Sequence, residues 1–538
     1  MPLGANCSAA GVDGPSPGFA LLVVGSAILG VLLLGCIALG LLGLLRGAAA
    51  PWLLIADFQA RYAPLRTAPR ELWLIYVLKL LESYGYFSFS IILVLFLSEE
   101  FELSDSAAGW AYGAFGMLTT VYGLCVGILV DNLGVRRSLL LGSSLLVLAR
   151  TMALVTTSIT TIYVVLFLVM PLGTALGIPV LTTAIKRYVP SAADGRAVAF
   201  GLFYAFMNVA ALVSGPVADV LRGAFGCGAV LFGRQLSPYR LLILTGVATS
   251  VLQLALSGFV REIEVKPGGG GPTTFRPRTG APWTIAREIC RTARFWRFLL
   301  LVVLLVAARL IFRHLDATLP KYLLRTHGPE VPYGLIYAIN PAMIIVLVPL
   351  VSAYTQSAPP LRMIRWGAAV TAASPFWLAV SSSLPAAVLF VVTLSMGEAC
   401  YSPRIYEYTT MVAPKGREGT YMALSSAPLF VAKLLAGGMS GALLETFCPA
   451  EPFGCAGGRT LWLIVGLVTA TSPVLLFACS RCIQPPGGDT TSAAEDGDDV
   501  ELRAADSAAG AQAHAATGAH PAADASTTRC GAGGSKDS

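Results

Sequence analysis

The sequence predicts an all-α polytopic membrane protein built from two six-helix bundles, preceded by one extra hydrophobic helix. Hydrophobic residues make up 55% of the chain, charged residues make up only 12%, and the mean hydropathy is +0.71. Apolar windows of about 20 residues, the length of a membrane-spanning helix, recur along nearly the whole sequence. A basic stretch, residues 261–297, divides the last twelve windows into six and six, and it contains eight Arg or Lys against three Glu. Helices are expected rather than a membrane barrel, because barrel strands would alternate in polarity.

The N-terminal part, residues 1–70, holds the extra hydrophobic run from Phe19 to Leu45. No Lys or Arg precedes this run, whereas Arg46 and Arg61 follow it. Because basic residues accumulate on the cytoplasmic side of a membrane, we interpret residues 1–70 as an outer N-terminus, a retained transmembrane helix and a cytoplasmic linker. A cleaved targeting segment is the alternative interpretation.

The first bundle, residues 71–260, has loops whose charges follow the positive-inside rule. The segment Ser98–Ser106 contains four acids and no base, so it is expected outside. The turns 131–137 and 186–196 are basic and are expected inside. The six predicted spans are residues 71–98, 108–130, 138–157, 161–185, 197–221 and 239–260.

The second bundle, residues 298–482, repeats this pattern after the basic cytoplasmic loop, and its inner turns contain Arg362 and Arg417 among other bases. Its predicted spans are residues 298–320, 333–354, 366–382, 385–411, 419–446 and 460–480. Residues 483–538 are rich in Ala, Gly, Ser and Asp. Such a segment cannot bury enough apolar surface to fold, so it is expected to be a disordered cytoplasmic tail.

The turn after the second predicted span carries a glycine, an acid, a second glycine and two bases, namely Gly127, Asp131, Gly134, Arg136 and Arg137. Gly127 permits close helix packing, and Gly134 permits a tight turn. Asp131 can pair with a neighbouring base in one conformation only. This motif resembles the cytoplasmic signature of the major facilitator superfamily; a plain basic turn is the alternative. The resemblance implies two halves related by an axis along the membrane normal, a substrate site between them near midplane, and a gating role for these five residues.

Other stretches resemble the proton-coupled oligopeptide transporter family within that superfamily. They are LESYGYFSFSIILVLFL in the first span, LGTALGIP in the fourth, FYAFMN in the fifth and GEACYSP in the tenth. The resemblance makes Glu82, Tyr204, Asn208 and Glu398 candidates for the transport cavity. In the first span Lys79 stands where the family has an acid, so we do not carry over a peptide substrate.

Charged residues inside the predicted spans are a second indication of a site. An ionisable group in a membrane costs roughly 3 kcal/mol and normally faces a paired or wet interior. Lys79 and Glu82 are three residues apart and share one helix face. Arg309, Arg313 and Asp316, spaced four and three residues apart, share another. Charges on the remaining spans are Arg150, Glu398, Arg404, Glu407 and Lys433.

The position of each charged residue along its span gives its distance from the membrane midplane, because each helical residue advances about 1.5 Å along the axis. Lys79, Glu82, Arg150, Arg309, Glu398 and Lys433 fall within about 10 Å of midplane, whereas Asp316 and Glu407 fall toward opposite ends. Cations outnumber acids four to two in the central group. This excess favours a substrate with negative charge, such as a carboxylate, with Glu82 or Glu398 as proton acceptor if transport is coupled. The alternative is that Lys79 pairs with Glu82, and Lys433 with Glu398, as gate latches.

Two further features concern covalent structure and helix shape. Cys448 and Cys455 lie in the last predicted outer loop with six residues between them, which makes them a disulfide candidate, with free thiols as the alternative. Pro171, Pro341 and Pro403 lie inside predicted spans and predict kinks there, because proline removes a backbone donor.

These observations predict a secondary active transporter of a small polar, carboxylate-bearing solute that works by alternating access, with proton coupling left open. An uncoupled facilitator and a non-transporting sensor on a transporter fold are the alternatives. The sequence shows no phosphate-binding loop, metal cluster or nucleophile with a visible base, so no enzyme activity, cofactor or metal is expected. The net charge of +7 follows from the basic loops and does not predict nucleic-acid binding. We expect a monomer in a lipid bilayer, with the plasma membrane favoured over an organelle membrane.

Overall fold

The computed structural model describes residues 65, 68–189, 193–231, 233–264, 273–274, 291, 293–355, 358–412, 418–451 and 454–483. The chain divides into two compact units, residues 1–483 and 484–538, and every element below belongs to the first. The predicted N-terminal helix, most of the loop 261–297 and the predicted tail lie outside the described residues.

The first half consists of helices that coincide, within a few residues, with the six predicted spans. In chain order they are α3 (Arg70–Glu100), α4 (Asp105–Leu133), α5 (Val135–Val155), a broken helix α6 (Ile159–Val164), η2 (Val165–Val169) and α7 (Met170–Tyr188), then α8 (Ala193–Ala224) and α9 (Pro238–Ser257). The break in the fourth span is a π-helical turn directly before Pro171. A π turn inside an α-helix shifts the hydrogen-bond register, which is a recognised cause of helix irregularity.

The second half repeats the pattern with more interruptions. Its helices are α11 (Ala293–Leu304), α12 (Val306–Ala317), α13 (Leu319–His327), α14 (Tyr333–Tyr354), α15 (Pro360–Ala373), α16 (Phe376–Val380), α17 (Leu384–Val412), α18 (Glu418–Phe447), α19 (Gly458–Ala478) and α20 (Ser480–Ile483). The chain bends by 41° between α11 and α12, where the sequence contains no proline. In contrast, α14 continues through Pro341 and Pro349, and α17 continues through Pro403.

Two short antiparallel hairpins lie in the connections between helices, and neither was predicted. Strands β1 (Ala229–Leu231) and β2 (Arg234–Leu236) pair with Ala229 opposite Leu236, between α8 and α9. Strands β3 (Ile263–Glu264) and β4 (Thr273–Thr274) pair after α9. The all-helical body is unaffected by them.

Within the described part of the chain, eight helices are long and apolar enough to cross a membrane, and the bent pair α11 and α12 adds a ninth. The two halves also contain α4, α18 and the pair α15 and α16 at the positions of predicted spans. Large apolar side chains such as Trp110, Leu168 and Val474 are exposed on the outside of the bundle. Lipid can cover such residues, so this surface agrees with a membrane protein.

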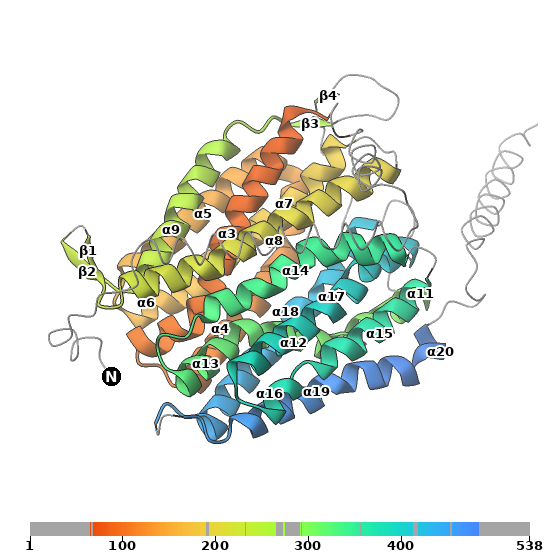
Figure 1. The fold of residues 1–538 in the computed structure, drawn as a ribbon. Coiled ribbons are helices and arrows are strands. Elements are labelled where there is room, and N and C mark those ends of the chain that lie inside the picture. Colours follow the sequence, from red (N-terminus) through yellow and green to blue (C-terminus); the bar gives the residue numbers. More distant parts are fainter. Residues whose placement is uncertain are drawn as a thin grey trace, which may run out of the picture. The chain divides into compact units, whose positions relative to one another are not determined.

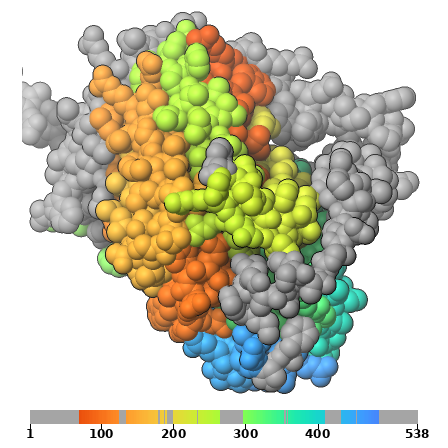
Figure 2. Space-filling model, turned by 90° about the vertical axis from the view of Figure 1, so that its left-hand side faces the viewer, coloured from red at the N-terminus to blue at the C-terminus, as the bar shows by residue number. Residues whose placement is uncertain are grey.

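The halves meet along two helix pairs, α4 with α18 and α8 with α14 (Figure 1). Glycines let both pairs approach closely. A Cβ added to Gly109 of α4 would lie 2.2 Å from the carbonyl oxygen of Gly437 in α18, and one added to Gly215 of α8 would lie 2.2 Å from that of Gly334 in α14. Both contacts lie toward the end of the bundle where α3 ends and α4 begins, which we call the outer end, following the predicted orientation. Figure 2 views this end and shows α4 in orange directly beside the blue end of α18.

Candidate functional site

The predicted charged residues lie inside the bundle, and several stand at the interface between the halves. We use the name central charge cluster for Lys79, Glu82, Arg150, Arg309, Arg313, Asp316, Glu398 and Lys433. Lys433 has no exposed surface, and Glu398, the most exposed of the three acids, is 8% exposed. Charges with so little access to water need specific partners, which the following contacts provide.

On α3, Lys79 and Glu82 form an ion pair of 2.9 Å, and both side chains are buried. The Lys79 ammonium also lies 5.1 Å from the centre of the Phe203 ring on α8. Gly177 of α7 faces Glu82, since a Cβ at this glycine would lie 3.8 Å from the Glu82 Cγ. The structure thus contains the internal Lys79–Glu82 pair that the sequence left as an alternative.

Arg150 of α5 lies wholly within the first half. Its Nη1 donates to the Ser250 hydroxyl and, at 3.3 Å, to the carbonyl oxygen of Gly246, both on α9. Gly85 of α3 lies against the guanidinium, because a Cβ there would come within 2.3 Å of Nη1. Arg150 therefore lies between α3, α5 and α9, and a larger residue at Gly85 would require its guanidinium to move.

Asp316, near the end of α12, is one of the acids that join the two halves. Its Oδ2 accepts from Arg313 of the same helix at 3.2 Å. It also accepts from the Tyr112 hydroxyl of α4 at 2.9 Å and from the Ser90 hydroxyl of α3 at 3.2 Å. A carboxylate shared in this way links α3, α4 and α12.

Lys433 of α18 does not pair with Glu398, so that predicted alternative is wrong in this structure. Its ammonium donates to the Tyr86 hydroxyl and the Ser90 hydroxyl of α3, each at 3.3 Å. It also faces aromatic rings of the first half, with the ring centre of Tyr112 at 4.2 Å and that of Phe115 at 4.7 Å. Lys433 is thus held by residues of the opposite half.

Glu398 of α17 lies where α8, α14 and α17 meet. Asn340 of α14 donates to its Oε2 at 2.9 Å, and the Tyr204 hydroxyl of α8 approaches its Oε1 at 3.5 Å. The charges of Arg309 and Arg313 act on Glu398 through space. The Tyr204 contact joins the halves, and its length makes it a weak hydrogen bond that a small movement would break.

The other two candidates bond to their own half. Arg309 of α12 donates to the Ser402 hydroxyl at 3.2 Å and lies 4.9 Å from the centre of the Tyr401 ring, both on α17. The side-chain amide of Asn208 donates to the Tyr204 carbonyl oxygen at 2.9 Å, one turn back along α8. This hydrogen bond of Asn208 stabilises α8, the helix that carries Tyr204, and does not reach the second half.

The central charge cluster is electropositive, with five cations and three acids. Two of the acids, Glu82 and Asp316, are already in ion pairs with Lys79 and Arg313. An excess of positive charge in a medium of low dielectric constant attracts anions strongly. The arrangement can therefore bind a solute with at least one negative group.

The predicted gating turn lies between α4 and α5. Gly134 has φ of +82°, a conformation that favours glycine. The Glu262 carboxylate, just after α9, accepts from the backbone N–H of Arg136 at 2.6 Å. Gly127 and Asp131 lie on α4, and the surroundings of both are outside what the structure describes. Arg137 is exposed. The part played by Glu262 was not predicted, because only the fold brings it beside this turn.

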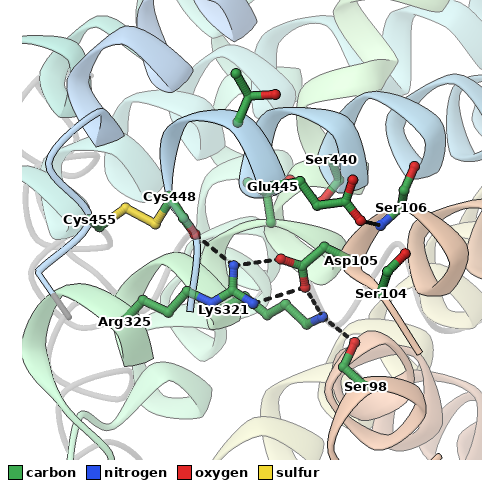
Figure 3. A network of polar contacts seen from close by, with 12 residues as sticks. Ser98, Ser104, Asp105, Ser106, Lys321, Arg325, Ser440, Glu445, Cys448 and Cys455 are labelled. Atoms are coloured by element: carbon green, nitrogen blue, oxygen red, sulfur yellow. Dashed lines mark hydrogen bonds and ion pairs between the residues drawn. A yellow bond between two sulfur atoms is a disulfide. The ribbon is translucent and has the colours of Figure 1, made fainter. Parts of the chain in front are cut away.

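At the outer end a buried acid of α4 binds two cations of α13 (Figure 3). Asp105 pairs with Lys321 at 2.5 Å and with Arg325 at 2.6 Å. Lys321 also donates to the Ser98 hydroxyl, and Arg325 donates to the carbonyl oxygen of Cys448 at the end of α18. We call these five residues the α13 clasp.

A disulfide between Cys448 and Cys455 closes the loop beside this clasp. The loop holds Arg325 twice, because the backbone N–H of Gly454 donates to the Arg325 carbonyl oxygen at 3.0 Å while the Arg325 side chain bonds Cys448. The sequence identified the two cysteines but not their relation to Arg325.

A second set of contacts, the α14 clasp, is formed by Asp219 and Arg222 of α8. Asp219 accepts from the backbone N–H groups of Gly334 and Leu335 at 3.1 and 2.7 Å, so it caps the first turn of α14. Arg222 pairs with Asp219 at 3.3 Å and stacks 4.5 Å from the centre of the Tyr333 ring. An acid at a helix N-terminus satisfies donors that lack partners within the helix. Both clasps therefore close the outer side of the interface between the halves.

Comparisons with known proteins agree with this architecture. The family model described as Major Facilitator Superfamily matches residues 75–437. Among solved structures, a POT family transporter in complex with 5-aminolevulinic acid superposes with a TM-score of 0.62 at 16% identity, covering 78% of this chain and 97% of that chain. A glutamate-to-glutamine mutant of the peptide transporter POT gives a TM-score of 0.61 at 17% identity, covering 77% and 95%. No curated protein matches the sequence.

At such low identity the solved structures establish the fold alone. The family model, however, spans more than half of the chain, and its match includes every member of the central charge cluster. The predicted resemblance to this superfamily is confirmed, and with it an integral multi-pass membrane protein that transports rather than catalyses. The chain belongs to the major facilitator superfamily of secondary transporters.

Proposed function

We propose that this protein moves a small polar, carboxylate-bearing solute across the membrane by alternating access, with the movement coupled to protons. The observation that carries the proposal is the electropositive central charge cluster, to which both halves contribute. A charge inside a membrane bundle is maintained only where it has a partner or a function. Here the cations exceed the acids, and a carboxylate would restore the balance.

We infer that the solute binds to side chains of α12, α8 and α17, namely Arg313, Tyr204 and Arg309 with Glu398 nearby. Arg313 retains 15% exposure of its side chain, and Tyr204 is half-buried, so both have surface to offer a solute. Arginine binds carboxylates through two parallel hydrogen bonds, which fixes orientation as well as affinity. Arg309 adds positive charge one turn before Arg313 on α12.

Glu398 is the better of the two proton acceptors named from the sequence. Its hydrogen-bond partners, Asn340 and Tyr204, are neutral, so it can bind a proton without breaking an ion pair. Glu82 would first have to leave Lys79. The weak contact from Tyr204 also places Glu398 at the boundary between the halves, where a change of charge can affect their separation.

The experiment begins with a thermal-shift screen of small mono-, di- and tricarboxylates on the purified protein, since a bound ligand raises the melting temperature. Uptake of the stabilising carboxylate is then measured in proteoliposomes under an inward proton gradient. Glu398→Gln is expected to abolish accumulation while leaving exchange of solute across the membrane largely intact. Glu82→Gln is expected to do the same if that residue binds the proton instead.

Glu102→Gln is the matched control, because it removes an exposed acid of the outer loop. It is expected to accumulate solute as the wild type does. Wild-type accumulation in both Glu398→Gln and Glu82→Gln would overturn the proton assignment. The Lys79–Glu82 pair supports a second candidate, an uncoupled facilitator in which this acid only stabilises a conformation. Uptake that does not respond to the pH gradient would favour the facilitator.

A further inference from the structure

Lys433 stands apart from the other central cations because of where its partners come from. Within the described residues, its hydrogen bonds and ring contacts all come from α3 and α4, in the opposite half. The ammonium has no exposed surface, so these contacts replace water entirely. A side chain of one half that is solvated only by the other half links the two.

The backbone of α4 is shaped to receive this side chain. A Cβ added to Gly116 would lie 2.5 Å from the Lys433 Cδ, and one added to Gly113 would lie 2.9 Å from the Leu434 Cα. The aliphatic stem of Lys433 therefore lies directly against α4. Its ammonium then reaches the faces of three rings, with centroids at 4.2 Å for Tyr112, 4.7 Å for Phe115 and 5.1 Å for Tyr86. Aromatic faces at these distances attract a cation and have much less attraction for a neutral amine.

Hydrogen bonds connect Lys433 to the acid at the centre of the interface. The Ser90 hydroxyl accepts from Lys433 at 3.3 Å and donates to Asp316 at 3.2 Å. Asp316 is also the ion-pair partner of Arg313, so two cations depend on one carboxylate. Removing the proton from Lys433 would weaken its contacts with the aromatic rings of α3 and α4. The loss of this attraction favours separation of α18 from α3 and α4.

The titratable and charged groups around Lys433 come from four helices. Tyr86 is on α3, Tyr112 is on α4, and Arg313 and Asp316 are on α12. Glu398 on α17 is bonded to other partners. Within this part of the structure, no carboxylate lies within ion-pair distance of the Lys433 ammonium, so its charge is stabilised only by hydroxyls, rings and the more distant Asp316.

From this geometry we propose that Lys433 is a positioning residue whose ammonium tethers α18 to α3 and α4, holding the outer half of the carrier closed while it is charged. The inference rests on the proposed function, because a carrier must open on this side, and it names the group whose charge permits the opening. Protonation favours the outer-closed state, and loss of the proton permits the outer-open state. This order is the one a proton symporter requires, because the protonated carrier closes outside before it releases solute inside.

The test is amide hydrogen exchange of the purified full-length protein without solute, corrected for the intrinsic effect of pH on exchange. The segments followed are the first turns of α4, residues 105–116, and the last turns of α18, residues 434–447. In the wild type, exchange of these segments is expected to rise as the pH is raised. Lys433→Met is expected to exchange roughly tenfold faster already at low pH, because the cation–π and hydrogen-bond contacts are absent. Lys433→Arg keeps the charge and is expected to remain protected at high pH.

The double variant Glu71→Gln/Arg261→Met is the control, since it removes an ion pair with a buried carboxylate that lies within the first half, at the opposite end of α3. It is expected to leave exchange at the outer end unchanged. If Lys433→Met does not fold, Tyr86→Phe/Ser90→Ala removes both hydrogen-bond acceptors and is expected to speed exchange at the outer end to a smaller extent. Wild-type protection in the folded Lys433 or Tyr86/Ser90 variants, or equal opening in the control, would overturn the tether. Because no solute is used, this result is independent of whether the carboxylate proposal holds.

Discussion

Asp316 receives three hydrogen bonds from three helices, and only one of its partners is charged. Its substitution by Asn would leave Arg313 buried without its ion pair. Loss of one partner of a buried pair costs about 3 kcal/mol, largely because the remaining charge is uncompensated. We therefore expect Asp316→Asn to lower the melting temperature of the purified protein clearly, as measured by thermal unfolding.

The double variant Asp316→Asn/Arg313→Met separates this explanation from simple loss of packing. It removes the orphaned charge together with the acid, so it is expected to regain part of the lost stability. If the single variant Asp316→Asn has the melting temperature of the wild type, Asp316 does not stabilise the contact between the halves.

The residue types of the site were predictable, but of the two pairings considered from the sequence only Lys79–Glu82 is present. Charge inside the spans identified every member of the central charge cluster, because buried charge is rare in membranes. Helix counting placed Asp316 toward one end of its span, and it is the second-last residue of α12. The partners of Lys433 are aromatic and hydroxyl side chains, which are ordinary residues in a membrane helix and gave no signal in the sequence.

Helix pairs at the interface depend on glycine at particular positions. An alanine at Gly109 would place its Cβ 2.2 Å from the Gly437 carbonyl oxygen, so α4 and α18 would have to separate. Overpacking of this kind costs about 2 kcal/mol. We expect Gly109→Ala to lower the melting temperature and to speed hydrogen exchange at the outer end.

Gly123 provides the matched control on the same helix, because nothing lies within 4 Å of a Cβ added there. Alanine is a better helix former than glycine, so Gly123→Ala is expected to be neutral or slightly stabilising. Equal loss of stability in both variants would indicate a general intolerance of α4 to alanine and would contradict a close contact at Gly109.

The disulfide loop after α18 is expected to support the α13 clasp. Cys448→Ser/Cys455→Ser removes a closure that stabilises a short loop by about 2 kcal/mol, and it frees the loop that binds Arg325. We expect faster hydrogen exchange around Asp105 and a lower melting temperature. Cys400→Ser, which changes a free cysteine of α17, is the control and should leave both unchanged. If hydrogen exchange around Asp105 is unchanged when the disulfide is lost, the loop does not stabilise the α13 clasp.

Element boundaries followed the hydrophobic pattern closely, whereas helix irregularities followed proline only at Pro171 among the three predicted positions. The helices α14 and α17 continue through their prolines, because neighbouring helices can satisfy the freed backbone groups in a membrane bundle. The π turn directly before Pro171 agrees with the irregularity predicted at this proline. The bend between α11 and α12 lies where the sequence contains no proline, and it was not predicted. The hairpins also escaped prediction, since each strand is only two or three residues long.

At the scale of the whole molecule, two kinds of contact hold the halves together. Both clasps and the close glycine contacts lie at the outer end, and the tether at Lys433 lies near the middle. The two-half architecture was predictable from the six-and-six pattern of spans and the basic loop. The sequence did not predict which side of the carrier is closed. That depends on contacts between residues more than 200 positions apart, such as Asp105 with Arg325.

The central claim is that one carboxylate site is exposed alternately to the two sides of the membrane. Counterflow in proteoliposomes tests it most directly, using the carboxylate identified by thermal shift. Vesicles preloaded with unlabelled solute are expected to take up labelled solute faster than empty vesicles, because a loaded carrier returns more readily. A rate that is independent of preloading, or a failure of every carboxylate to enter through the wild-type protein, would contradict the account.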